Sequence, residues 1–329
     1  MRSLFAFALA ALLLLAAPAL ATPRIVAVGD LHGDFAAYQA ILRAARLIDA
    51  QDRWIGGDSI FVQTGDVPDR GPDSLRIIRH LMRLQDEAQR AGGRVVPLVG
   101  NHEAMNITDD LRYVHPGEYA AFATRDSARR RTRVFESNRA AIERFYRARD
   151  TGLSDTDIRR TWYRETPLGK VEHQSAWHPT GEIGRWVLRN PAVALIDGTL
   201  FVHGGLSADY ASRSLDEINR AVAAALTARE TGRESIINDR VGPLWYRGLV
   251  TREGEERASP PSIEDELTRV LTAYGARRIV IGHTPSLAGI IIAHGGRLIR
   301  IDSGISAHYS GRRSYLEIVN GEAVAHLVP

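Results

Sequence analysis

Three short blocks of this chain contain the residue types that bind divalent metal ions. They are residues 29–34 (GDLHGD), 65–71 (GDVPDRG) and 100–103 (GNHE). Their carboxylate, amide and imidazole groups form the mixed oxygen and nitrogen donor set that suits Mn, Fe or Zn. Asp30 and His32 are two residues apart, so an extended backbone would direct both side chains to one side. The blocks are therefore candidate metal-binding turns.

Each block follows a short apolar run that is rich in β-branched residues. Residues 24–28, 59–64 and 94–99 form these runs, and their length and composition predict buried strands. Apolar residues at three- and four-residue spacing predict helices over 35–48 and 74–91. Alternating strands and helices are typical of a layered α/β fold. Ligands bind beyond the carboxyl ends of strands in such sheets, so we expect the blocks to meet at one edge.

Two further strand ends carry histidines. Residues 192–196 and 199–202 predict a hairpin because Asp197 and Gly198 form a turn signal between them. The second strand is followed by His203, and the β-branched run 278–281 is followed by His283. The alternating runs of the C-terminal tail, from residue 289 to 328, predict antiparallel strands.

The strand ends together supply six candidate metal ligands. These are Asp30, His32, Asp66, Asn101, His203 and His283. Six donors are too many for one tetrahedral ion, and they suit two ions that share a carboxylate. For Asp30 or Asp66 taken alone, a helix N-cap is the alternative, since helices follow both. Agreement among five strand ends favours the metal site.

In this order, the blocks resemble those of the calcineurin-like metallophosphoesterases. More narrowly they resemble the phosphoprotein phosphatases, whose pattern is GDxHG, GDxxDRG, GNHE, HGG and a last His. Asp34, residues 243–248 (PLWYRG) and residues 281–284 (IGHT) are similar to the bacterial Shewanella-like branch. The resemblance spans most of residues 24–304. It implies a four-layer α/β/β/α sandwich of two mixed sheets, the metallo-dependent phosphatase fold.

The resemblance also implies two divalent ions, with Mn²⁺ expected and Fe or Zn as alternatives. Asp30, His32 and Asp66 would hold the first ion. Asp66, as the bridge, would hold the second with three further ligands: Asn101, His203 and His283. A hydroxide bridging the ions would attack phosphorus in line with the leaving oxygen.

Four more residues receive roles from the resemblance. His102 would protonate the leaving oxygen, and Asp69 would hold its imidazole in the required tautomer. Arg70 would clamp the phosphate oxygens, and Arg247 is a candidate for a second clamp. The expected function is that of a two-metal phosphomonoesterase acting on phosphoproteins, phosphopeptides (Ser/Thr or Tyr) or small phosphoesters.

Two other functions remain as alternatives. A diadenosine-polyphosphate hydrolase shares these blocks, but such nucleotides are cytoplasmic and we expect secretion. A catalytically inactive metal-binding module would need neither His102 nor Arg70, and both are present. The eukaryotic Arg-Ala-His and Ser-Ala-Pro-Asn-Tyr motifs are absent, which leaves the choice between Ser/Thr and Tyr open.

Residues from about 104 to 189 predict an inserted helical cap, because this segment is charged, Arg-rich and poor in β-branched runs. Trp162, Trp177 and Trp186 within it would either line a substrate cleft or form a separate aromatic core. The Arg-rich run 129–133 is interpreted as a solvated helix face, with a docking patch for an acidic partner as the alternative.

Residues 1–21 have one positive charge, a short apolar core and an Ala-x-Ala-like end, which predict a cleaved secretory signal. An uncleaved membrane anchor is the alternative. The remaining residues, 22–329, would form the metallophosphoesterase domain, in the periplasm or outside the cell and without a stable membrane anchor.

The chain has no Cys, so disulfides and thiol nucleophiles are excluded. Net charge is only +3, and no nucleic-acid partner is expected.

Several remaining polar residues receive provisional interpretations. We expect Asp34 and Glu103 to be structural, and an approach of Tyr309 to the site is an alternative to an ordinary loop position. Seven histidines lack a strand-end position and are interpreted as surface or core residues: His80, His115, His173, His178, His294, His308 and His326.

Overall fold

The computed structural model describes residues 22–254 and 257–329, so the expected signal segment lies outside the described residues. The first of two five-stranded sheets has the order β10-β9-β1-β2-β3. Its strands are β1 (Ile25–Val28), β2 (Ile60–Gln63), β3 (Arg94–Pro97), β9 (Ser314–Val319) and β10 (Glu322–Leu327). Strands β1, β2 and β3 are parallel, whereas β9 and β10 are antiparallel additions at one side.

The second sheet has the order β4-β5-β6-β8-β7. Its strands are β4 (Val193–Ile196), β5 (Thr199–Val202), β6 (Arg278–Ile281), β7 (Ile291–Ala293) and β8 (Leu298–Arg300). Strand β8 pairs antiparallel with β7 as expected, but it runs parallel to β6. The tail strands therefore pair antiparallel with one another as predicted, β7 with β8 and β9 with β10, whereas the pairing of β8 with β6, which precedes the tail, is parallel.

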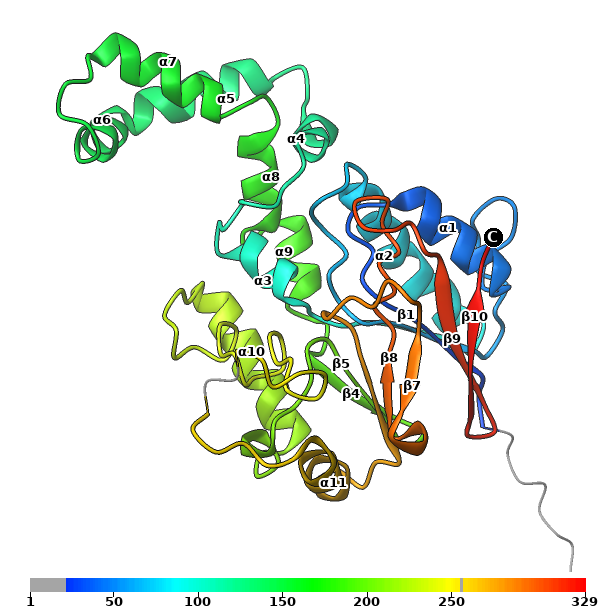
Figure 1. Cartoon of the computed structure of the whole chain (residues 1–329). Coiled ribbons are helices and arrows are strands. Elements are labelled where there is room, and N and C mark those ends of the chain that lie inside the picture. The colour runs from blue at the N-terminus through cyan, green and yellow to red at the C-terminus, as the bar shows by residue number, and fades with distance from the viewer. Residues whose placement is uncertain (1–21, 255–256) are drawn as a thin grey trace, which may run out of the picture.

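Alternating side chains of the strands divide the core into layers. Ile25 and Ala27 of β1 face a cluster between the sheets that includes Val280 of β6. Val26 and Val28 face the helices instead. Helices α1 (Phe35–Ala44) and α2 (Ser74–Arg90) cover the first sheet, and α10 (Leu215–Ala228) and α11 (Ile263–Ala273) cover the second (Figure 1). This arrangement confirms the predicted four-layer α/β/β/α fold with two mixed sheets.

Helix α1 ends earlier than the periodicity predicts. It ends at Ala44, and Arg46 has a φ of 54°, which breaks the helix. Ile48 then forms an isolated bridge with Trp54 rather than a last helical turn. Two short 3₁₀ helices, Ala208–Tyr210 after β5 and His294–Gly296 after β7, also occur.

Between β3 and β4 the chain forms seven helices. They are α3 (Asn101–Ile107), α4 (Pro116–Phe122), α5 (Ser127–Ser137), α6 (Arg139–Arg147), α7 (Asp155–Glu165), α8 (Lys170–Trp177) and α9 (Glu182–Val187). Figure 1 shows α5, α6 and α7 as an arm that projects from the two-sheet body, with α8 leading back to it. We call α4 to α9 the cap.

The cap tryptophans are mainly structural. Trp177 and Trp186 are buried in the main hydrophobic core. Trp162 packs against Phe135 with ring centroids 5.2 Å apart. Trp177 and Trp186 are therefore part of the main core and not of a separate one, whereas Trp162 also lines a cavity of about 490 Å³ among the cap helices.

The Arg-rich run of α5 is largely engaged within the cap. Arg129 pairs with Asp126 at 2.9 Å, and Arg130 lies 3.5 Å from Glu172. Arg131 donates to the carbonyl of Thr166 at 3.1 Å. These contacts favour a solvated helix face over a docking patch.

Among residues 22–254 and 257–329, no helix combines the length and apolar character needed to cross a membrane.

Candidate active site

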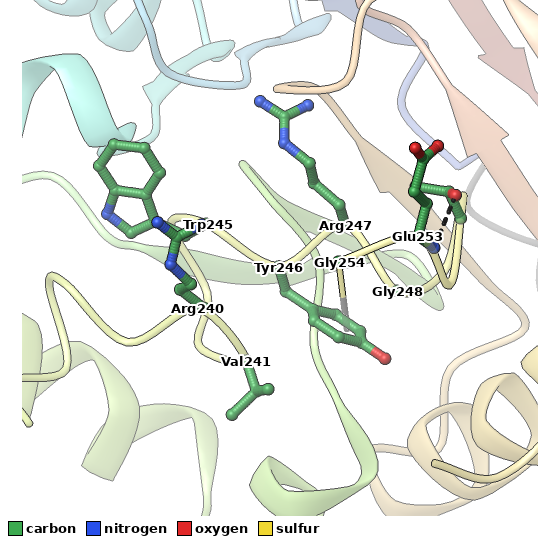
Figure 2. A pocket seen from close by; sticks show the side chains of 9 residues that line it. Arg240, Val241, Trp245, Tyr246, Arg247, Gly248, Glu253 and Gly254 are labelled. Carbon is green, nitrogen blue, oxygen red and sulfur yellow. Dashed lines mark hydrogen bonds between the residues drawn. The ribbon is translucent and has the colours of Figure 1, made fainter. Parts of the chain in front are cut away.

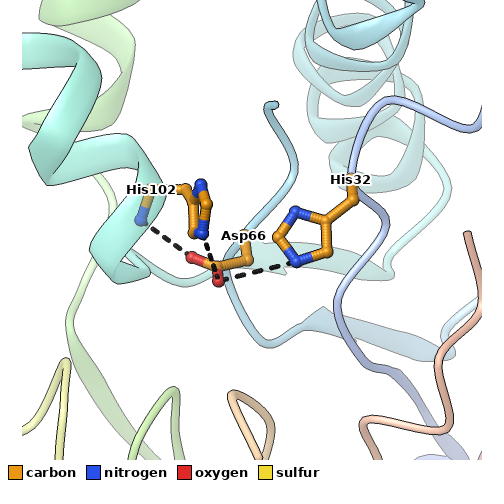
Figure 3. Close-up of side chains that lie close together, drawn as sticks. All are labelled: His32, Asp66 and His102. Carbon is orange, nitrogen blue, oxygen red and sulfur yellow. Dashed lines mark hydrogen bonds and ion pairs between the residues drawn. The ribbon is translucent and has the colours of Figure 1, made fainter. Parts of the chain in front are cut away.

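The predicted donors converge beyond the carboxyl ends of the central strands, around Asp66. His203 Nε2 lies 3.3 Å from Asp66 Oδ1. His32 Nε2 and His102 Nε2 lie 3.9 and 3.8 Å from Asp66 Oδ2. Figure 3 shows the imidazoles of His32 and His102 on either side of this carboxylate. Four residues from distant parts of the chain therefore share one buried centre.

Two groups of donors have Asp66 in common. His32, Asp66 and His102 form one, and Asp66, His203 and His283 form the other, with ligand atoms within 4.8 Å of one another in each. Asn101 Oδ1 lies 2.9 Å from His203 Nε2, so it belongs beside the second group. The shared Asp66 carboxylate is the arrangement that the sequence predicts for a pair of ions, but His102 stands in the first group where the prediction has Asp30.

Asp30 lies beside the second group as well as at the end of β1. Both of its carboxylate oxygens accept from the backbone N–H of His283, at 3.2 and 3.1 Å. All six predicted ligands are therefore assembled in one region. His102, which we expect to act as an acid, also lies within reach of the first group.

The hydrogen bonds of the histidines fit metal binding. His32 Nδ1 lies 3.1 Å from the Pro68 carbonyl, and His203 Nδ1 lies 2.8 Å from the Thr64 carbonyl. Each Nδ1–H therefore donates to a backbone oxygen and leaves Nε2 available toward the centre, as in metal-ligating histidines. His283 Nε2 is buried and has no hydrogen-bond partner in the structure. Such an orphaned nitrogen fits a ligand position.

The electrostatics of the site favour bound cations. Burial and the charges of Asp302 and Asp66 raise the pKa of Asp30 well above its usual value. Burial lowers the pKa of His32 to about 3 and that of His283 well below normal, so both imidazoles are neutral. Burial is outweighed by the Asp66 carboxylate, which raises the pKa of His203 above its usual value, and a divalent ion would take the place of the proton on His203. The donor set therefore fits two divalent ions.

Glycines and Glu103 hold the blocks in place. A Cβ at Gly100 would lie 2.4 Å from Asp66 Oδ1, and one at Gly282 would lie 2.4 Å from Asp30 Oδ1. The Glu103 carboxylate accepts from the backbone N–H groups of Gly100 at 2.8 Å and of Asp66 at 2.9 Å. Burial, with the charge of Asp66, raises the pKa of Glu103 to about 7.

Asp34 accepts from the N–H of Ala37 at 2.9 Å and caps α1. The expectation that Asp34 and Glu103 are structural agrees with these contacts.

His102 and Asp69 form a buried dyad. His102 Nδ1 lies 2.5 Å from Asp69 Oδ2, and the amide of Asn106 donates to Asp69 Oδ1 at 3.0 Å. Burial lowers the pKa of His102, but the Asp66 and Asp69 carboxylates outweigh it and raise this pKa above the usual value. The protonated imidazole can therefore present Nε2–H toward the centre of the site.

Both predicted phosphate clamps line the same cavity of about 300 Å³. The Arg70 guanidinium lies 4.7 Å from the ring centre of Tyr113 and 5.3 Å from that of Tyr309. Arg247 Nη1 donates to the His283 carbonyl at 2.9 Å, which fixes it beside the second donor group. The ring of Tyr309 lies 5.6 Å from that of His32, so this tyrosine does approach the site.

A second cavity of about 270 Å³ adjoins the first and shares Trp245 and Arg247 with it. Figure 2 shows its lining, with Tyr246 and Arg247 pointing in different directions from adjacent positions. The PLWYRG segment therefore borders both cavities.

Sequence reasoning missed several residues of the site. Asp302 is buried, and burial with the charge of Asp66 raises its pKa to about 6. It lies just beyond β8, so the strand-end signal used for the other donors was available for it. Trp245 belongs to the PLWYRG segment, whereas Tyr113 and Glu118 have no distinguishing pattern.

His308 also lies nearer to the site than expected, because its Nε2 is 3.4 Å from Arg70 Nη1. Among the other six histidines, His80 and His173 are core residues and His178 is exposed.

Comparison with known proteins agrees with this geometry. Residues 23–287 match the model of the calcineurin-like phosphoesterase family. The chain is 34% identical to Shewanella-like protein phosphatase 2 of Arabidopsis thaliana over 86% of this chain and 71% of that protein. It is 32% identical to an uncharacterized protein of Schizosaccharomyces pombe over 89% of this chain and 76% of that protein. The solved structure of a cold-active protein tyrosine phosphatase aligns with a TM-score of 0.68 and 26% identity, over 93% and 77% of the two chains.

Proposed function

Because the chain belongs to the calcineurin-like phosphoesterase family, whose members are metal-dependent hydrolases, we propose that it removes phosphate from phosphoproteins or phosphopeptides. One observation carries this proposal. Asp66 is common to two groups of metal-binding side chains, and the His102–Asp69 dyad lies beside it. This arrangement combines a site for two divalent ions with an acid for the leaving group.

Each residue of the site has a defined task in the proposed reaction. Two ions, when bound, would polarise the phosphate and lower the pKa of a water molecule. Asp30, His32, Asp66, Asn101, His203 and His283 would hold them, with Mn²⁺ expected and Fe or Zn as alternatives.

The remaining polar groups act on the substrate itself. Arg70 and Arg247 bind the phosphate oxygens from the cavity wall. His102 Nε2 gives its proton to the leaving oxygen, while Asp69 holds Nδ1 and so fixes the tautomer.

Aromatic side chains at the cavity support a preference for aryl phosphates. Tyr113, Trp245 and Tyr309 line it together with Arg70. Such rings pack favourably against an aromatic leaving group. The similarity to the cold-active protein tyrosine phosphatase supports phosphotyrosine as the preferred residue.

A metal-reconstitution assay tests this function. Protein purified in chelator and then supplied with Mn²⁺ should hydrolyse aryl phosphates, and phosphotyrosine peptides faster than phosphoserine peptides of the same sequence. Faster turnover of diadenosine tetraphosphate would favour the nucleotide hydrolase. Two bound metal ions without hydrolysis of any phosphoester would favour the inactive module.

The location of this activity is a separate proposal from the sequence alone. Residues 1–21 act as a secretory signal, and the mature protein works in the periplasm or outside the cell. Phosphorylated peptides or small phosphoesters in that compartment are the expected substrates, with no nucleic-acid partner and no stable membrane anchor.

A further inference from the structure

Two residues that follow α3 in the chain, Tyr113 and Glu118, hold the loop that carries Asp69 and Arg70. The backbone N–H of Asp69 donates to Glu118 Oε1 at 2.8 Å, and Glu118 belongs to cap helix α4. The backbone N–H of Arg70 donates to the Tyr113 carbonyl at 2.9 Å. Ser74, the first residue of α2, donates its hydroxyl to the same Glu118 oxygen at 2.5 Å. Consecutive N–H groups of the loop are thus bound from outside the two-sheet body.

This loop requires such support because its backbone is strained. Asp69 and Arg70 have φ values of 75° and 66°, in the left-handed region. That conformation is unfavourable for side chains other than Gly, although Asp adopts it more readily than most. An unpaired buried N–H at Asp69 would add a further penalty. Glu118 provides the buried acceptor, and its side chain is fully shielded from solvent.

Only one oxygen of the Glu118 carboxyl group makes these hydrogen bonds. Oε2 has no hydrogen-bond partner and lies 3.7 Å from His173 Nε2. Burial and the charge of Asp69 raise the pKa of Glu118 to about 8, so near neutral pH it is a neutral acid with Oε1 as acceptor. A glutamine can reproduce this acceptor, whereas leucine cannot.

We infer that Glu118 is a positioning residue of the proposed reaction, through which the cap holds Asp69 in place against His102. The inference rests on the proposed phosphatase function. Glu118 does not touch the reacting atoms. It places the Asp69 carboxylate, which in turn orients the imidazole that gives up the proton. The cap therefore supplies the residue that positions the His102–Asp69 dyad.

A leaving-group comparison distinguishes this role from simple stabilisation of the fold. Phenyl phosphate and 4-nitrophenyl phosphate have similar shapes, but nitrophenolate leaves without a proton and phenolate benefits from one. In Glu118→Leu, kcat for phenyl phosphate relative to 4-nitrophenyl phosphate should fall about tenfold, a part of the contribution of a general acid. In Glu118→Gln this ratio should stay within about threefold of wild type, because the acceptor remains.

Glu172 provides a matched control. It is a cap carboxylate that accepts from Ser127 at 2.8 Å and is not among the partners of the 69–74 loop. Glu172→Leu should leave the ratio unchanged even if the cap is destabilised. In an Asp69→Asn background, Glu118→Leu should lower the ratio no further, because its effect passes through Asp69.

The outcomes separate this inference from the proposed function. If the wild type hydrolyses neither ester, the proposed function is wrong. If the wild type is active and Glu118→Leu folds with an unchanged ratio, or Glu172→Leu lowers the ratio equally, the positioning role is wrong. If Glu118→Leu is insoluble, Glu118→Asp is measured in its place. Its acceptor is one methylene short, so an unchanged ratio in that variant also overturns the inference.

Discussion

His173 offers a stability test of the buried polar groups where the cap meets the body. This imidazole is fully buried among aromatic rings, with the Tyr119 and Phe122 centroids 5.3 and 5.1 Å away. Neither ring nitrogen has a hydrogen-bond partner in the structure. A buried polar group without a partner costs free energy. We therefore expect His173→Leu, which is similar in volume and has no polar atoms, to stabilise the protein.

The size of the effect depends on pH because burial lowers the pKa of His173 from 6.5 to about 4. The unfolded chain binds a proton below pH 6.5, and the folded protein binds it only near pH 4. Stability is therefore complete above the unfolded pKa and falls as the pH decreases toward 4. The loss is about 2 kcal/mol at about pH 5 and reaches about 3 kcal/mol below the folded pKa. The leucine variant lacks this loss.

Urea unfolding of metal-free protein at about pH 7.5 and about pH 5 measures the effect. The stability difference between His173→Leu and wild type should be about 2 kcal/mol larger at the lower pH.

His80 is the matched control, because this buried histidine lies 3.0 Å from Tyr38 Oη and 2.8 Å from the Asp52 carbonyl. His80→Leu should destabilise the protein by about 1–3 kcal/mol at neutral pH. If the stability difference between His173→Leu and wild type is the same at both pH values, the imidazole is not neutral and unpartnered. Its partner would then be Glu118, whose Oε2 lies 3.7 Å from His173 Nε2.

The remaining predictions concern the site and the N-terminus. His102→Asn should lower kcat for phenyl phosphate about 10²–10⁴-fold and for 4-nitrophenyl phosphate much less, and equal losses would contradict the acid role. Asp66→Asn should reduce bound metal below two equivalents by elemental analysis and abolish turnover, since both donor groups share this carboxylate. Retention of two equivalents would show that the shared-ligand assignment is wrong. N-terminal sequencing of protein from a secreting host should begin at Thr22, and an intact Met1 would contradict the secretory signal.

The sequence by itself determined the strands and the turns that carry the chemistry. Short β-branched runs have few alternatives to buried strands. The turns after them need glycine because the Asp66 and Asp30 carboxylates lie where a Cβ of Gly100 or Gly282 would be. The parallel direction of β1, β2 and β3 follows from the helices between them. The meeting of Asp30, His32, Asp66 and Asn101 at one edge of the first sheet follows from these local features, whereas His203 and His283 follow β5 and β6 of the second sheet and reach the same centre through the packing of the two sheets.

Only the tertiary structure decided which residues from elsewhere complete the site. Glu118 of α4 and Tyr113, which precedes α4, bind the Asp69–Arg70 loop because the chain after α3 folds back onto the body, and no periodicity in the sequence encodes that docking. The neighbours of β8 likewise depend on the path of the chain between sheets rather than on the strand's own pattern. Local patterns record burial and backbone preference, whereas contacts between distant segments depend on how whole layers pack.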